Sequence, residues 1–249
     1  MCGETKPLCN AHLLPDSFKK IATNFKRAGA RVVPVNQEDG RILSPVQTLP
    51  FDKSILCSDC DRLLGAYDKY LKEFLLSWAD NRQREFDPRL NWVDRLIDVP
   101  GDWDRVHMGL LSVLLRFSFS NRHADIAIGT SHEAAAASFF LGNKSEDISR
   151  FSSMRLLGSP IVRLNGVADL TRICSSQPLH FRVEGAHIYN FDLFGLHALI
   201  KIGKAFWPSA LRQLPSNCTA DGKIPIRLIN FEHTIIGREL QRVFGWSQT

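Results

Sequence analysis

Two cysteines separated by two residues, Cys57 and Cys60, carry the strongest chemical signal in the chain. They end a strand-like segment and open a helix, and a tight turn of this kind points both thiolates at one metal ion, as in half of a treble-clef or ββα zinc site. Tetrahedral zinc needs two further ligands, and Cys2 and Cys9 are the candidates nearest the N-terminus. The alternative is a pair of buried thiols at a helix start.

Composition indicates an ordinary globular protein. Of the 249 residues, 44% are hydrophobic and 23% are charged. No apolar run reaches the length of a membrane-spanning helix, and the first residues lack the pattern of a signal peptide. We therefore expect a cytoplasmic protein with reduced cysteines and no membrane contact. The formal charge of +5 mildly favours a polyanionic partner.

Hydrophobic periodicity predicts a mixture of helices and strands. The expected helices cover about residues 17–25, 59–81, 104–120, 131–141 and 193–207. The expected strands cover about residues 159–167, 179–191 and 223–231, with an edge-like hairpin around Asp39-Gly40 and a loop over 82–103. Asp104 and Ser131 are the expected N-caps, and Gly142 is the expected C-terminal stop of the fourth helix.

These elements predict an α+β fold in two parts. Residues 1–80 would form a small zinc-organised ββα or treble-clef module, and residues 81–249 a larger α+β domain that selects the substrate or docks a protein partner. The boundary is soft, because the helix at 59–81 can pack on both parts.

The N-terminal motifs resemble the HNH-type endonucleases, in particular a divergent group with the pattern C-x-x-C-G, then histidine, two aliphatic residues and proline, then L-C-x-x-C and an acidic residue. Cys2-Gly3 matches the end of the first knuckle, His12-Leu13-Leu14-Pro15 the histidine motif, and Leu56 to Asp61 the second knuckle. The resemblance covers roughly the first seventy residues.

This resemblance implies hydrolysis of phosphodiester bonds, with DNA favoured over RNA as the substrate, and with structural Zn2+ and catalytic Mg2+ or Mn2+. His12 would be the general base and Asp61 a ligand of the catalytic ion, while Asp68, two helical turns further on, would orient His12 or support the metal. The first cysteine of the family pattern is absent. Either Cys9 replaces it, which we favour, or the natural start lies upstream, or the site is degenerate. The family's middle asparagine has no counterpart, and Ala11 stands where an acidic or hydroxyl residue is usual.

Three other interpretations remain open at this stage. The module could be an inactive, zinc-stabilised nucleic-acid-binding or protein-assembly module. His187 and His197 could share a separate site in the second part of the chain. Arg116, in an aliphatic helix, could pair inside the domain, which we favour, or point to a phosphate.

Overall fold

A computed structural model describes most of the chain. The described residues are 1–22, 49–85, 95–143, 147–159, 163–164, 168–169, 174–175 and 177–229. The predicted hairpin around Asp39-Gly40 lies outside them. The helices are α1 (Ser17–Ala22), α2 (Ser58–Glu85), α3 (Trp103–Phe119) and α4 (Thr130–Phe140), with short 3-10 turns η1 (Asn121–Ile126), η2 (Ile148–Arg150) and η4 (Ser209–Leu211). The strands are β1 (Ala11–His12), β2 (Phe51–Asp52), β3 (Leu96–Pro100), β4 (Ser152–Gly158), β5 (Arg163–Leu164), β6 (Ala168–Asp169), β7 (Leu179–Val183), β8 (Ala186–Leu193), β9 (Leu196–Ile202) and β10 (Lys223–Leu228).

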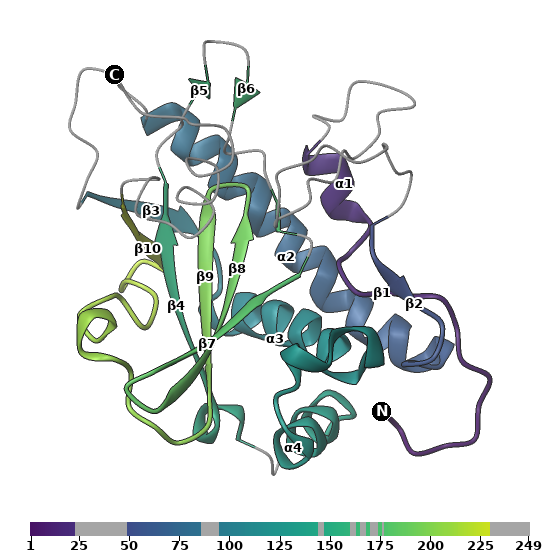
Figure 1. Ribbon diagram of the computed structural model, residues 1–249. Helices are drawn as coiled ribbons and strands as arrows, with labels where there is room; N and C mark the ends of the chain where they lie inside the picture. The colour runs from purple at the N-terminus through teal and green to yellow at the C-terminus, as the bar shows by residue number, and fades with distance from the viewer. Residues whose placement is uncertain are drawn as a thin grey trace.

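The expected α+β class is confirmed. Six strands form one sheet in the order β3-β10-β4-β9-β8-β7, in which only β10 and β4 run parallel. Figure 1 shows α2 as a long helix passing behind this sheet, with α3 next to it and β1, β2 and α1 beside α2. None of the helices in the described ranges is long and apolar enough to cross a membrane.

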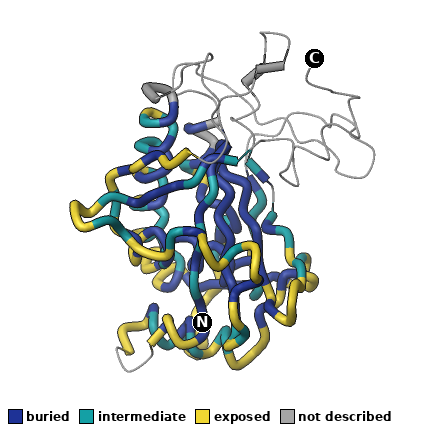
Figure 2. The backbone as a smooth tube through the Cα atoms, turned by 90° about the vertical axis from the view of Figure 1, so that its left-hand side faces the viewer, coloured by how far each residue is buried: buried dark blue, intermediate teal, exposed yellow. Residues whose placement is uncertain are grey.

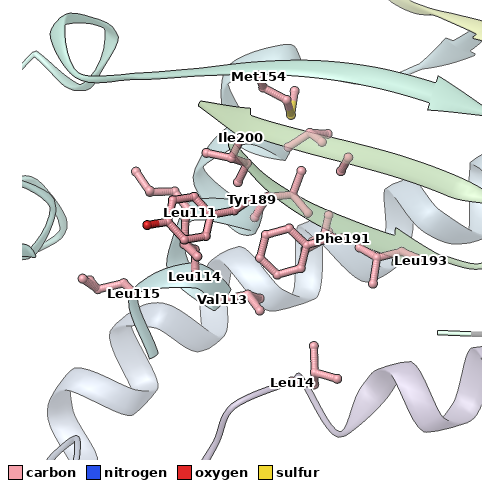
Figure 3. Packing of buried hydrophobic residues seen from close by; sticks show 14 of the residues in the cluster. Leu14, Leu111, Val113, Leu114, Leu115, Met154, Tyr189, Phe191, Leu193 and Ile200 are labelled. Atoms are coloured by element: carbon pink, nitrogen blue, oxygen red, sulfur yellow. The ribbon is translucent and has the colours of Figure 1, made fainter. Parts of the chain in front are cut away.

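The main core fills the space between the sheet and the helices α2 and α3. Trp78 of α2 and Leu110 and Leu114 of α3 are fully buried there against residues of the sheet such as Phe191. Figure 3 shows part of this packing, and Figure 2 shows how buried residues follow the central strands and the facing helices. Leu14, from the N-terminal part, belongs to the same cluster. The helix α2 is therefore common to both predicted parts of the chain.

Several local predictions are wrong. The predicted helix over 193–207 is a turn followed by β9, and the predicted loop over 82–103 contains the end of α2 and the whole of β3. Phe194 and Gly195 both adopt positive φ, 56° and 78°, as a two-residue hairpin turn requires. This turn joins β8 directly to β9, and long-range pairing with β4 and β8 then prevails over the helical appearance of the sequence.

The helix ends also differ in detail from the prediction. Asp102, not Asp104, is the N-cap of α3, since its side chain accepts a hydrogen bond from the Arg105 amide. The N-cap of α4 is Gly129 rather than Ser131, and no side chain caps this end. The C-terminal stop at Gly142 is confirmed by its φ of 95°.

Candidate functional site

Three of the four predicted zinc-binding cysteines come together at the start of α2. The sulfur atoms of Cys2, Cys57 and Cys60 all lie within 4.8 Å of one another. An isolated bridge between Leu8 and Cys57 holds the N-terminal segment beside the second knuckle. Contact between residues 2 and 57 thus depends on backbone pairing between two distant segments.

The geometry of this group fits zinc. Two thiolates about 2.3 Å from one zinc ion at the tetrahedral angle are about 3.8 Å apart, and Cys2 Sγ lies 3.8 Å from Cys57 Sγ. The backbone amide of Cys60 lowers the pKa of Cys57, whereas burial and the bond with Cys57 raise the pKa of Cys60 to about 12. Without metal the Cys60 sulfur therefore retains its proton, and a cation that binds thiolates would displace it.

Cys9 does not belong to the three-cysteine group, although it lies nearby. Its amide donates to the Leu56 carbonyl at 2.9 Å. Burial, followed by the charges of Asp61 and Cys57, raises the pKa of Cys9. Its role as the fourth ligand stays a prediction.

The predicted base, His12, ends the short strand β1. Its neighbour Ala11 pairs with Asp52 of β2, and His12 pairs with Phe51. Asp52 is buried and accepts hydrogen bonds from Ser120 Oγ at 2.7 Å and from Ser54 Oγ at 2.6 Å. The strand that carries His12 is thereby attached to the end of α3.

The predicted metal ligand and its supporting carboxylate lie on one face of α2. Asp61, Gly65 and Asp68 are four and three residues apart, the spacing of successive helical turns. One open pocket of about 300 Å³ brings this face together with His12. Its lining residues are His12, Pro15, Asp16, Ser17, Asp61, Gly65, Asp68, Lys69 and Lys72. The structure therefore gathers His12, Asp61 and Asp68 around a single solvent-accessible space.

Asp68 is held in place by a buried arginine. The Arg116 guanidinium, 1% exposed, donates to both carboxylate oxygens of Asp68, at 2.9 and 2.8 Å. Burial raises the pKa of Asp68, while the charge of Arg116 opposes that shift. The preferred expectation for Arg116, pairing inside the domain, is confirmed, and its partner is a residue of the candidate site.

Asp61 and His12 retain their polar atoms for other partners. Within the described parts of the chain, neither the Asp61 carboxylate nor the His12 imidazole makes a hydrogen bond or an ion pair. The His12 ring lies 6.5 Å from that of Phe51 between centroids, and its charge acts on Asp68. A carboxylate can bind a hard divalent cation, and an imidazole can accept a proton from water.

The sequence reasoning missed the two lysines and the glycine of the pocket. Lys69 and Lys72 lie two and three helical turns from Asp61, so extension of the same helical spacing would have found them. Gly65 could not be recognised from spacing, because only the structure shows that the space above its Cα is open.

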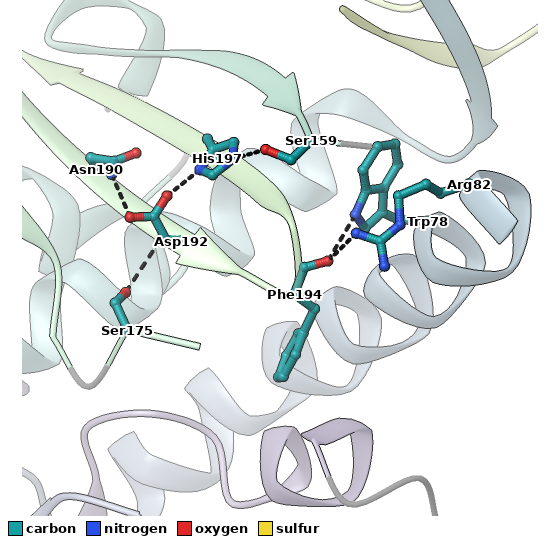
Figure 4. A network of polar contacts seen from close by, with 8 residues as sticks. All are labelled: Trp78, Arg82, Ser159, Ser175, Asn190, Asp192, Phe194 and His197. Atoms are coloured by element: carbon teal, nitrogen blue, oxygen red, sulfur yellow. Dashed lines mark hydrogen bonds and ion pairs between the residues drawn. The ribbon is translucent and has the colours of Figure 1, made fainter. Parts of the chain in front are cut away.

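His187 and His197 belong to separate networks, so the idea of a shared site is wrong. His197 lies between Asp192 and the Ser159 hydroxyl, which is 2.6 Å from its Nε2 (Figure 4). Ser159 is fully buried, and its amide donates to the Gly195 carbonyl at 2.7 Å. The order serine, histidine, aspartate is that of an acyl-transfer triad, but such a triad needs an accessible hydroxyl and free amide donors. We therefore interpret it as a structural network that joins β4, β8 and β9.

A second contact in this region attaches α2 to the turn between β8 and β9. The Phe194 carbonyl accepts from Trp78 Nε1 at 3.3 Å and from the Arg82 guanidinium at 2.8 Å (Figure 4). The helix that carries the candidate site is thus fixed to the large sheet.

Comparisons of the chain with protein-family models, with curated proteins and with solved structures give no match.

Proposed function

We propose that the protein is a metal-dependent endonuclease of the HNH type that hydrolyses phosphodiester bonds, with DNA as the favoured substrate. The observation that carries the proposal is the pocket that His12, Asp61 and Asp68 share, next to a group of three cysteines. Residues 12 and 61 are far apart in sequence, and an arrangement without function would not require them to face one open space.

The local chain path supports the same proposal. An antiparallel pair of short strands, β1 and β2, precedes the long helix α2, with the histidine on the first strand and the carboxylates on the helix. A paired set of two strands followed by a helix resembles a ββα-metal module, although α1 lies between β1 and β2 in the chain. The cysteine knuckle at the start of α2 would correspond to the zinc knuckle of the divergent HNH group.

Two different metal ions enter the proposal. Zn2+ would be bound by Cys2, Cys57 and Cys60, with Cys9 as the fourth ligand, and would stabilise the module. Asp61 would bind Mg2+ or Mn2+, which supplies a positive charge for the phosphate in the transition state.

The side chains of the pocket have distinct tasks. His12 accepts the proton of the attacking water through an imidazole nitrogen. Lys69 and Lys72 attract the phosphate group as point charges. Arg116 keeps the carboxylate of Asp68 in one orientation, because both oxygens accept from its guanidinium.

A cleavage assay with Mg2+ or Mn2+ tests the base. We expect His12→Ala to reduce cleavage of DNA by about a hundred- to ten-thousand-fold, with zinc content, folding and DNA binding preserved. His123→Ala, a histidine outside the pocket, is the control. Unchanged cleavage by His12→Ala would refute the assignment of the base.

Two neighbouring aspartates provide a matched test of the metal ligand. Asp61 lines the pocket, whereas Asp59, in the same helical turn, pairs with Lys6 and Arg62 on the surface. Asp61→Asn should lower cleavage and recover in part at higher Mg2+ or Mn2+ concentration, and Asp59→Asn should cleave normally. Equal behaviour of the two variants would contradict the role of Asp61.

The zinc assignment has an independent test. Protein purified without added metal should contain about one zinc per chain by elemental analysis, and Cys57→Ser should lose it together with the fold of the N-terminal residues. Folded protein free of zinc would contradict the assignment. Loss of zinc in Cys9→Ser would identify the fourth ligand.

A zinc-stabilised module that binds nucleic acid or a protein without hydrolysis is the second candidate. Ala11 is fully buried where an acidic or hydroxyl residue is usual in the family, and both oxygens of Asp68 are already engaged by Arg116. Binding of DNA that weakens with salt, without cleavage of any DNA or RNA, would support this candidate. A protein partner for the second part of the chain stays a prediction.

A further inference from the structure

Two exposed histidines lie side by side on the hairpin formed by β7 and β8. His180 is on β7 and His187 on β8, and the strands are joined at Glu184 and Gly185, whose φ values are 47° and 80°. Two positive φ values are the mark of a tight hairpin turn. In this register His180 and His187 are diagonal neighbours on one face, within reach of each other.

The two imidazoles have a defined mutual geometry. His180 Nε2 lies 3.0 Å from His187 Nδ1, and the rings stack with 11° between their planes. His180 also stacks on the buried Tyr189, with 4.6 Å between centroids. The ring of His180 is therefore fixed from one side by Tyr189 and contacts His187 on the other.

The contact between the two rings requires at least one uncharged imidazole. At 3.0 Å one nitrogen donates a hydrogen bond and the other accepts it, so two imidazolium rings would face each other with like charges. Burial, followed by the charge of His187, lowers the pKa of His180. The ring that accepts this hydrogen bond carries a lone pair on the accepting nitrogen.

We propose that His180 and His187 together bind a divalent transition-metal ion, with Cu2+ and Ni2+ preferred over Zn2+. Two imidazole nitrogens bound at about 2.0–2.1 Å are about 2.9 Å apart at a right angle and about 3.3 Å apart at the tetrahedral angle. The observed 3.0 Å is closer to the right angle, which is the geometry of tetragonal Cu2+ and Ni2+. The ring of His180 is packed against Tyr189, so the exposed ring of His187 is the one that turns about its Cβ–Cγ bond to aim its lone pair at the ion.

The surroundings of the pair carry charges of both signs. The exposed Arg182 is the register partner of His187 across the hairpin. The exposed Asp125 of η1 interacts electrostatically with His180 and favours positive charge beside it. Water completes the coordination of an ion bound at this exposed place. The site uses imidazoles alone and differs in ligand type from the thiols of the cysteine group.

Ni2+ is the probe, because it does not oxidise thiols as Cu2+ does. The untagged full-length protein is saturated with Zn2+ at the cysteine group and then titrated with Ni2+ by calorimetry. We expect the wild type to bind one Ni2+ per chain. In His180→Asn and in His187→Asn the affinity for Ni2+ should fall at least about tenfold, because loss of even a residue that only supports a metal ligand costs about that much. His123→Asn, which changes a histidine whose ring packs on Phe117, should bind Ni2+ as the wild type does.

Thermal unfolding of each variant verifies that it is folded, which the exposure of both histidines leads us to expect. Absence of Ni2+ binding by the wild type, undiminished binding by the double variant His180→Asn/His187→Asn, or an equal loss in His123→Asn would each overturn the proposal. None of these results depends on nuclease activity.

Discussion

Substitutions of Gly65 can distinguish the stability of helix α2 from the role of the pocket in catalysis. It lies inside the helix, and a Cβ at this position would meet no atom within 4 Å. Glycine in a helix interior is less favourable than alanine by roughly 0.5–1 kcal/mol, because the unfolded chain is more flexible. Gly65→Ala should therefore raise the free energy of unfolding by about that amount, and the unfolding temperature by roughly 2–4 °C for a chain of this size.

A larger side chain at the same position should reduce catalysis in the pocket without lowering the stability of the helix. Gly65 lies between Asp61 and Asp68 on the face of α2 that lines the pocket of about 300 Å³. Gly65→Leu places a branched apolar group between these carboxylates, where the proposed substrate phosphate must lie. A displacement of about 1 Å at a reacting centre costs about a hundredfold in rate, so we expect cleavage to fall by at least about a hundredfold.

Urea unfolding followed by circular dichroism measures the stability, and cleavage kinetics of the same preparations measure the activity. For Gly65→Leu we expect a free energy of unfolding equal to or above that of the wild type, together with a nearly complete loss of cleavage activity. Wild-type cleavage by a stable Gly65→Leu would refute the use of this surface in catalysis. Destabilisation by Gly65→Ala would refute the inference that the space above the glycine is open.

Three further predictions concern the core that supports the site. Gly158→Ala should lower the free energy of unfolding by about 1–3 kcal/mol, because the new Cβ would lie 2.3 Å from the ring of the buried Trp78. A urea midpoint equal to that of the wild type would contradict this clash. His107 is buried, and burial lowers its pKa from 6.5 to about 4, so the unfolded chain takes up a proton first as the pH falls. Protonation of His107 should thus lower the free energy of unfolding by about 3 kcal/mol between pH 6.5 and 4. In urea titrations at a series of pH values, His107→Gln should remove this pH dependence. An unchanged pH dependence in the variant would contradict the assignment to His107. Hydrogen bonds from Ser120 and Ser54 lower the pKa of Asp52 to about 2. The Asp52 carboxylate therefore contributes about 2 kcal/mol to the free energy of unfolding above about pH 4, and this contribution is lost as the pH falls through 2. Asp52→Asn should be less stable than the wild type at pH 7 but not at pH 2, and a difference in stability that does not change with pH would refute the role of its charge.

The sequence alone determined those structural features that depend only on residues close to one another along the chain. The Cys57-x2-Cys60 turn and the helix behind it follow from local spacing. The segment 179–191 was expected to be strand, but the turn at Glu184-Gly185 that divides it into β7 and β8 was not predicted. The carboxylates of Asp61 and Asp68 were placed on one helical face by their seven-residue separation, and the pocket contains both. Local rules suffice for such pairs because the helix itself sets their relative positions.

Tertiary structure decided the rest, since it brings distant segments together. The segment after Phe194 forms a strand because β4 and β8 offer partners for its backbone, and a fully buried apolar run has no periodicity that distinguishes strand from helix. Cys2 reaches Cys57 through pairing of the N-terminal segment with the second knuckle, and Arg116 reaches Asp68 because α3 packs on α2. His12 meets the face of α2 because β2 holds its strand at the end of α3. Contacts of this kind join residues up to sixty-eight positions apart. The free energy that selects them comes from the packing of the whole core, which residue spacing does not express.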